Sequence, residues 1–474
     1  MVRIARSHPA AAALACLALS ACVVGPTYHV PASAVVNAPA AKAPFKSADG
    51  RAFALQDPPD HWWRLYQDPV LDRLVEQTLA ANTDLRVAEA NLERSQALLE
   101  AARAARQPDV MVNFGTSETA RSAEQYVHKG PIPTKGLYDT GLAVSYDLDL
   151  FGRLKRGVEA ASAQTQAFQA ARDLARVNVA AETVRAYAEV CDAGAESAAV
   201  ERVIALQRQG AVLVRRMARG GRDIAVNVAR QQEQEDQLRA GLPALSARRT
   251  NALYRLAVLA GRPPETFDPA LEACREPLKV GAPLPVGDGA SLLRRRPDVR
   301  AAERRLAAAT AEIGVNTAAL YPTVIFGASV GSTGALSDFG DPLTRRFSIG
   351  PAISWRLNQS VPRAQVEAAR AEAKAELARF DGAVLNALQE TESALTAYTR
   401  DLDREASLEA GRAKAVQLAT AAHRLQAGGR LGASGVLEAN RAVAAADQTL
   451  AATRSQISQD QIAVFLALGG GWEK

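Results

Sequence analysis

The chain has 474 residues, a formal net charge of +5 and only 5% aromatic residues. Loss of Arg3 and Arg6 with an N-terminal signal would leave +3, which gives little attraction for an acidic partner. Basic residues are not interleaved with aromatic ones, so we expect no nucleic-acid partner. Size alone would suggest two or three globular domains.

Residues 1–21 are predicted to be a secretory signal peptide. Arg3 and Arg6 precede an apolar run, residues 10–19, that is too short to span a membrane stably. The run ends in Leu19-Ser20-Ala21-Cys22, which resembles a bacterial lipobox. We therefore expect covalent lipid on Cys22 and a lipid-anchored tether over residues 22–61. The alternative is an ordinary signal peptide followed by an incidental cysteine.

The remainder of the chain contains an internal duplication. Residues 82–90 recur as residues 296–304, at an offset of 298 − 84 = 214. Residues 157–161 recur as residues 365–369, at an offset of 367 − 159 = 208. A repeat of this length must occupy two equivalent places in one architecture. We predict a first repeat over residues 62–262, a proline-rich periplasmic connector over 263–295 and a second repeat over 296–474.

Proline placement predicts long helices in both repeats. There is no proline between Pro133 and Pro243 and none after Pro362, while an interior proline costs a helix about 3 kcal/mol. The first repeat should form a helix over 151–209 and a second helix from Asp223 back to Gly261. The second repeat should form helices from Arg363 to Gln426 and back to Leu468. Glycine pairs after the outgoing helices suit helix ends and tight turns.

Four segments are candidate strands: residues 110–117, 144–150, 323–331 and 347–357, with apolar and polar residues alternating in the second and the fourth. Such strands suit a membrane barrel, although an ordinary soluble sheet is the alternative. Four strands cannot close a barrel, and an open sheet edge cannot face lipid. The strand pattern therefore predicts an oligomer.

Four motifs carry a resemblance to a known family: Cys22-Val23-Val24-Gly25-Pro26-Thr27-Tyr28; Trp62-Trp63 with Asp68-Pro69; Arg295-Arg296-Pro297-Asp298-Val299-Arg300-Ala301-Ala302-Glu303; and Leu468-Gly469-Gly470-Gly471-Trp472. Together they resemble the NodT-type outer membrane efflux lipoproteins of the TolC-like family. The second hairpin departs from the family pattern, with residues 432–435 in place of an acidic, apolar stretch and Asn440 in place of Gln.

The resemblance implies a mostly α fold with membrane β structure: a homotrimer with four strands per chain in a twelve-stranded outer-membrane β-barrel, continued by a long periplasmic α-helical barrel. It implies the outer membrane of a Gram-negative bacterium. There the protein would be the channel of a tripartite efflux pump, a passive exit duct for small molecules such as drugs. Its partners would be a periplasmic adaptor and an inner-membrane RND-type transporter.

Catalytic motifs are missing from the sequence. There is no Walker-type Gly-Lys-Ser/Thr and no His-Glu-x-x-His, and the five histidines are scattered. We therefore expect no enzyme activity, no metal and no cofactor apart from the lipid on Cys22. Two alternative functions remain, which are a duct for type I protein secretion and a periplasm-spanning scaffold without a pore.

The hairpin tips are the candidate entrance. We expect them to lie at the periplasmic mouth, where they would meet the adaptor. Polar contacts of Arg222, Asp223 and Arg430 are the candidate restraints on a closed state, and the alternative is that these are solvated turn residues. The tip residues are Gly220, Gly221, Arg222, Asp223, Gly428, Gly429 and Arg430.

Two predictions concern the connector. If lipid takes Cys22, the mature chain keeps Cys191 and Cys274, an even pair in an oxidising compartment. We predict a disulfide between them that ties the connector to the helices, the alternative being two buried free thiols. Residues 294–296, three consecutive arginines, are expected in a solvated loop before a helix that begins at Pro297.

Overall fold

The computed structural model describes residues 23–48, 50–120, 130, 133–221 and 224–470. It divides into two compact units. Unit 1 is made of described residues within Met1–Pro31, Leu92–Phe168 and Ala302–Phe380, and unit 2 of those within Ala32–Asn91, Gln169–Ala301 and Asp381–Lys474. Each predicted repeat contributes to both units, so the units do not coincide with the repeats.

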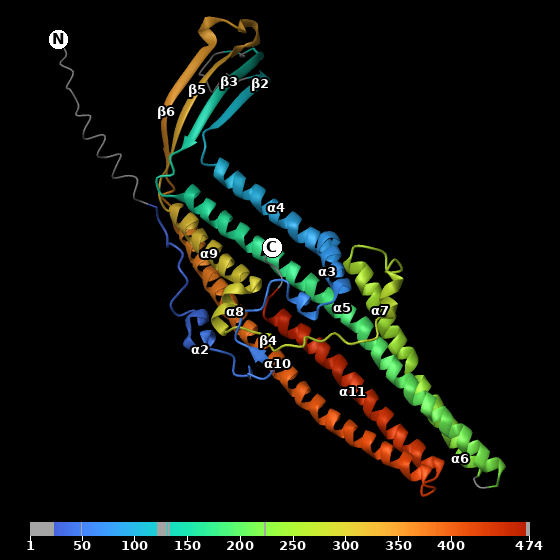
Figure 1. The fold of residues 1–474 in the computed structure, drawn as a ribbon. Coiled ribbons are helices and arrows are strands. Elements are labelled where there is room, and N and C mark those ends of the chain that lie inside the picture. The colour runs from blue at the N-terminus through green and yellow to red at the C-terminus, as the bar shows by residue number, and fades with distance from the viewer. Residues whose placement is uncertain (1–22, 49, 121–129, 131–132, 222–223, 471–474) are drawn as a thin grey trace. The chain divides into compact units, whose positions relative to one another are not determined.

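Unit 1 contains a four-stranded antiparallel sheet of order β2-β3-β5-β6 (Figure 1). All four predicted strands are present, with different bounds. The prediction for β3 was too late, because Gly136 and Gly141 weaken its pattern and Asp149 leaves the extended conformation at φ 45°. The strands are β2 (Asp109–Thr119), β3 (Lys135–Asp147), β5 (Thr323–Ala335) and β6 (Arg345–Ser354).

The register of this sheet separates an apolar face from a polar one. Two rows of paired residues on one face are apolar across all four strands: Phe347, Val330, Leu142 and Val112, and Ile349, Ala328, Val144 and Val110. Phe347 and Val112 are 82% and 75% exposed, so none of the described residues covers those two side chains. A neighbouring row on the opposite face carries Arg346 and Asn113 with two glycines between them.

Four helices pass from one unit into the other: α4 (Thr83–Ala104), α5 (Arg153–Arg219), α9 (Pro297–Ala318) and α10 (Ser360–Ala427). The carboxylate of Asp149 caps α5, since it accepts from the N–H groups of Leu154 and Lys155 at 2.8 Å each. Pro362 lies in the first turn of α10, where its missing N–H costs nothing. Helix α9 begins at Pro297, as predicted.

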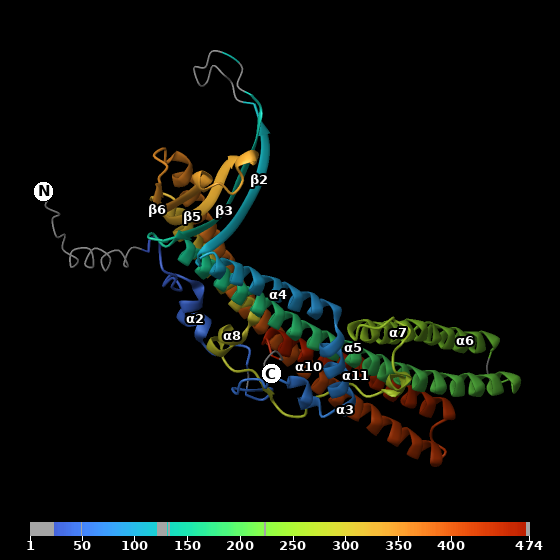
Figure 2. The same cartoon turned by 90° about the horizontal axis from the view of Figure 1, so that it is seen from above.

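Each outgoing helix forms a hairpin in unit 2 (Figure 2). Helix α10 is followed by a continuous α11 (Ala433–Ala467). Helix α5 is followed by α6 (Ala225–Ala240) and α7 (Leu242–Leu259), separated at Gly241, so the prediction of one returning helix was wrong. Pro243 explains the break, because it lacks an N–H and its ring clashes with the preceding turn. The equivalent position in α11 is Ala451, since 451 − 243 = 208.

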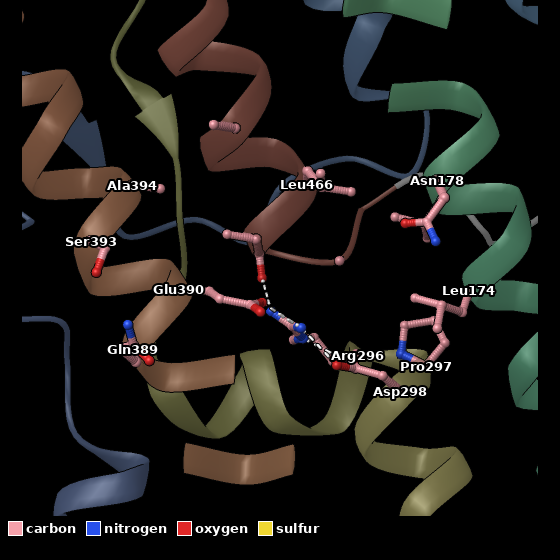
Figure 3. Close-up of a pocket in the computed structure, with 14 residues that line it drawn as sticks. Leu174, Asn178, Arg296, Pro297, Asp298, Gln389, Glu390, Ser393, Ala394 and Leu466 are labelled. Atoms are coloured by element: carbon pink, nitrogen blue, oxygen red, sulfur yellow. Dashed lines mark hydrogen bonds and ion pairs between the residues drawn. The ribbon is translucent and has the colours of Figure 1, made fainter. Parts of the chain in front are cut away.

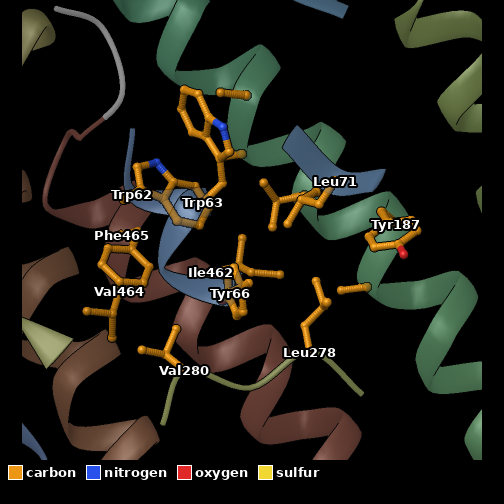
Figure 4. Close-up of a cluster of buried hydrophobic side chains, with 14 of the residues drawn as sticks. Trp62, Trp63, Tyr66, Leu71, Tyr187, Leu278, Val280, Ile462, Val464 and Phe465 are labelled. Carbon is orange, nitrogen blue, oxygen red and sulfur yellow. The ribbon is translucent and has the colours of Figure 1, made fainter. Parts of the chain in front are cut away.

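The core of unit 2 gathers aromatic and aliphatic side chains from the tether, α5 and α11 (Figure 4). Trp62, in the short helix η2 (Trp62–Tyr66), is fully buried and stacks on Phe465 with ring centroids 4.7 Å apart. Helix α3 (Pro69–Ala81) follows, capped by Asp68, whose other carboxylate oxygen accepts from Tyr187 Oη at 2.9 Å. Burial of each large apolar side chain contributes about 1.5–3 kcal/mol.

Residues 32–61 of the tether and the whole connector, residues 263–295, belong to unit 2. Strand β1 (Phe53–Ala54) pairs in parallel with β4 (Leu284–Pro285). The predicted disulfide is present, with the Sγ atoms of Cys191 and Cys274 2.07 Å apart. Short helices complete the described chain: η1 (Val35–Asn37), α2 (Pro39–Lys42), η4 (Pro269–Ala273), α8 (Gly289–Arg295), η5 (Leu336–Asp338) and η6 (Pro342–Thr344).

Among the described residues, no helix combines the length and the hydrophobicity that a membrane crossing requires.

Candidate functional site

Both hairpins turn on the glycine pairs that the sequence singled out. In each pair the N–H of the first glycine donates to the carbonyl four residues earlier at 3.1 Å, which ends the outgoing helix. The second glycines, Gly221 and Gly429, have φ of 69° and 71°. L side chains rarely adopt this left-handed conformation, so glycine fits both positions. The two repeats therefore end their outgoing helices in the same way at these glycines.

The residues predicted to restrain the tips are only partly described. Arg222 and Asp223 lie outside the described residues. The N–H of Arg430 donates to Leu425 O at 2.8 Å, which completes the cap of α10. The role of these residues in closing an entrance stays a prediction.

A polar contact between the hairpins involves residues that the sequence analysis missed. Arg441 of α11 donates to Gln231 Oε1 of α6 at 2.5 Å. Gln207 of α5 donates Nε2 to the carbonyl and side-chain oxygens of Gln231, at 3.0 and 3.1 Å. One chain of hydrogen bonds thus joins α5, α6 and α11 within a few turns of the tips. Arg441 ends the 436–441 segment that resembles the family pattern, which is the signal that could have found it.

Arg296 forms a junction between three helices and corrects the expectation of a solvated loop (Figure 3). Only 8% of the residue is exposed. Its Nη1 donates to Ala467 O at the end of α11 at 2.9 Å, and its Nη2 pairs with Glu390 of α10 at 2.8 Å and Asp298 of α9 at 2.7 Å. The local sequence could not reveal this, because the partners on α10 and α11 lie far along the chain.

The first repeat contains a neutral version of this junction. Asn82 occupies the place of Arg296, and its side-chain amide donates to Leu259 O at 3.0 Å. Leu259 in turn corresponds to Ala467, since 467 − 259 = 208. Asn82 also caps α4, with its Oδ1 accepting two backbone N–H groups. In both repeats, the residue that directly precedes a helix, α4 or α9, thus donates a hydrogen bond to a carbonyl at the end of the returning helix, α7 or α11. At Arg296 ion pairs are added to this contact.

A cavity of about 500 Å³ lies beside Arg296. Side chains of α5, α10 and α11 line it, including Leu174, Asn178, Gln389 and Ala394 (Figure 3). Because the guanidinium of Arg296 is already shared between two carboxylates and a carbonyl, its hydrogen bonds are committed to the fold. The arrangement is that of a structural junction.

A buried carboxyl group lies next to the disulfide in sequence. Asp192 is fully buried; Gln459 donates to its Oδ2 at 3.1 Å, and its Oδ1 has no partner among the described side chains and backbone. Burial raises the pKa of Asp192 to about 8, opposed by the Gln459 hydrogen bond and supported by the negative charges of Glu196 and Glu189. Arg248 pairs with both glutamates and lowers this pKa.

The predicted lipid site, Cys22, lies outside the described residues. Within the described ranges, no three His, Cys, Asp or Glu side chains come together in a way that would hold a metal ion.

Comparison with known proteins identifies relatives along nearly the whole chain. The family model "Outer membrane efflux protein" matches residues 74–262 and 290–470. Nodulation protein T of Rhizobium leguminosarum bv. trifolii is 27% identical, with 96% of each chain covered. The toluene efflux pump outer membrane protein TtgI of Pseudomonas putida is 26% identical, with 97% of each chain covered. The solved outer-membrane channel OprN is 32% identical and superimposes with a TM-score of 0.87, covering 95% of this chain and 100% of its own.

Proposed function

The chain belongs to the outer membrane efflux protein family, and we propose that it works as a homotrimer with a periplasmic adaptor and an inner-membrane RND-type transporter. It is a channel of the Gram-negative outer membrane that extends into the periplasm, and it is the passive exit duct of an efflux pump. In this proposal lipid on Cys22 anchors each chain. The relative that exports toluene supports small organic molecules as the solutes.

The observation that carries the assembly is the uncovered sheet of unit 1. One face presents continuous apolar rows, as a lipid-facing barrel wall does. Among the described strands, the two outer ones, β2 and β6, each have one edge without a partner in the sheet. Lipid offers no hydrogen bonds to such an edge, so β2 of one chain must pair with β6 of another. Three chains would close a barrel of twelve strands.

In the same proposal the hairpin tips form the periplasmic entrance. The support is that both repeats place an equivalent glycine turn at the end of a long helix. The hydrogen bonds of Arg441 and Gln231 join the two hairpins near that end, and opening would have to break them or move both hairpins together.

The assembly is tested by native mass spectrometry of the detergent-purified chain and by conductance in planar bilayers. We expect a trimer that forms discrete channels. A stable monomer or dimer, or a trimer without conductance, would contradict the proposal.

The entrance is tested with the variants Asp223→Ala, Arg430→Ala and Arg441→Ala. The conductance of each purified variant is recorded in planar bilayers, and the drug susceptibility is measured on cells that carry it. We expect at least one of these variants to raise open-channel conductance. Arg400→Ala is the control, because Arg400 is an exposed residue of α10 whose ion pair lies within its own helix. Equal conductance in all four variants and the parent would refute the assignment of the entrance.

A further inference from the structure

The segment that directly follows Cys22 is held against unit 1 by one buried arginine. Only 5% of Arg156, on α5, is exposed. Its Nε donates to Val24 O at 3.2 Å and its Nη2 to Gly25 O at 3.1 Å. Its Nη1 pairs with Glu159 at 2.6 Å, so all three guanidinium nitrogens have partners. The N–H of Val24 donates in turn to Phe151 O at 3.2 Å.

Close approach of two backbones makes this contact possible. A Cβ atom on Gly25, whose φ is +86°, would lie 2.4 Å from Gly314 Cα of α9. A Cβ atom on Gly314 would lie 2.7 Å from Cγ of Arg156. Real Cβ atoms do not approach other atoms this closely. Both glycines are therefore needed for the segment to pack directly against α9 and for the Arg156 side chain to pack over it. We call Arg156, Gly25 and Gly314 the linker seat.

Tyr28 extends the same contact along α9. Its Oη donates to Glu303 Oε1 at 3.1 Å, and the guanidinium carbon of Arg304 lies 5.6 Å from its ring centroid. Four residues after Val24, the segment is therefore fixed a second time, by a hydrogen bond and a cation–π contact. Two separate sets of contacts hold it in one path.

The internal duplication offers an equivalent surface where a second linker seat could form, but that surface lacks the seat residues. The offset of 208 places Ala364 where the first repeat has Arg156. The offset of 214 places Glu100 where the second repeat has Gly314, and Ala90 where it has Arg304. The equivalent surface lacks the arginine, the glycine and the ring partner. The two repeats have thus diverged at the positions that receive the segment, and the described residues form one seat.

We propose that the linker seat positions the lipid anchor, which makes Arg156 a positioning residue for the acyl chains on Cys22. In the sequence only Val23 separates Cys22 from the seated Val24, and a chain spans at most about 8 Å over two residues. Without the seat Val24 keeps one backbone hydrogen bond, to Phe151 O; if that bond opens too, the next side-chain anchor is Tyr28, six residues from Cys22, which allows a reach of about 20 Å. The seat thus fixes where the lipid enters the membrane relative to the sheet of unit 1. This inference rests on the proposed lipidation.

The seat itself is tested by hydrogen–deuterium exchange of residues 23–31 in the purified full chain. We expect Arg156→Ala and Gly25→Ala each to speed exchange there at least tenfold. Gly25→Ala acts from the linker side and leaves the helices unchanged, so it remains informative if Arg156→Ala folds poorly. Arg370→Ala is the control, since it removes an exposed arginine with the same i,i+3 glutamate pairing. Unchanged exchange in both seat variants would overturn the seat.

The positioning of lipid is tested by the fraction of chain recovered from the outer membrane as heat-resistant trimer. We expect Gly25→Ala to lower that fraction severalfold in the lipidated chain. It should have no further effect in a Cys22→Ser chain secreted through a non-lipoprotein signal peptide. An equal loss in both backgrounds would overturn the role in lipid positioning. The mass of the N-terminal peptide separates the two claims: an unacylated peptide refutes lipidation, while the exchange result still decides whether the seat exists.

Discussion

Replacing Arg296 with alanine should destabilise unit 2 more than the same replacement of an exposed arginine. The side chain is 9% exposed and pairs with Asp298 and Glu390, which are 27% and 54% exposed. Removing one partner of a buried ion pair costs about 3–5 kcal/mol. Because water can reach both carboxylates after the change, we expect a loss at the lower end, about 3 kcal/mol.

The first repeat supplies a matched comparison. Arg296→Asn introduces the residue that Asn82 provides, which can cap the helix and reach the same carbonyl. A capping asparagine is worth about 1 kcal/mol over alanine, so this variant should lose about 2 kcal/mol. Arg379→Ala is the negative control, because the Arg379 side chain is 58% exposed and the ion pairs of an exposed arginine contribute about 0–1 kcal/mol.

The assay is thermal unfolding of the purified protein, followed by tryptophan fluorescence. At about 2 °C per kcal/mol, the lower end for large domains, the midpoint should fall by about 6 °C for Arg296→Ala and about 4 °C for Arg296→Asn. Arg379→Ala should stay within about 2 °C of the parent. If Arg296→Ala behaves like the control, the junction does not stabilise the fold. If Arg296→Asn is the worse variant, the equivalence with Asn82 is wrong.

Three further predictions follow from unit 2. Because burial raises the pKa of Asp192 to about 8, the folded chain keeps a proton that the unfolded chain releases near pH 4. Stability should therefore fall as pH rises from about 4 to 8. With Asp192→Asn the thermal midpoint should change less with pH over that range, and an unchanged dependence on pH would contradict this. Replacing Cys191 and Cys274 together with alanine should cost a few kcal/mol, since the bridge spans 83 residues; reductant should lower the midpoint of the parent and not of this variant. Gly429→Ala places a side chain at φ 71° and should cost about 1 kcal/mol, visible as faster hydrogen exchange at that tip and not at the Gly221 tip.

Much of the architecture was predictable because its causes are local. Alternation of apolar and polar residues, interrupted at Pro351, identified β6, and the glycine pairs identified the hairpin tips. The disulfide followed from counting the cysteines of an exported chain. The break at Gly241 was also local, since Pro243 marks it, but the expectation of two matching hairpins favoured one helix.

Other features depend on partners far along the chain and could not be predicted. Arg296 reads as part of a basic run, and its burial depends on Glu390 and Ala467, which are brought to it by the fold. Arg156 likewise reads as an exposed helical residue, because its backbone partners in the N-terminal segment are 131 and 132 positions away. Comparing the two repeats position by position would have identified both residues, because each differs from its counterpart.

The break before Pro243 also has a mechanical consequence. A continuous helix such as α11 resists bending along its whole length, whereas an interrupted one bends most easily at the interruption. In each chain we therefore expect one stiff hairpin and one compliant hairpin. In a trimer, a force applied at the tips would bend the three hairpins that contain the break, while the other three stay straight. In the proposed trimer with its entrance at the tips, that entrance would then widen with threefold rather than sixfold symmetry, and Pro243→Ala, which introduces the alanine found at position 451, should make it harder to open.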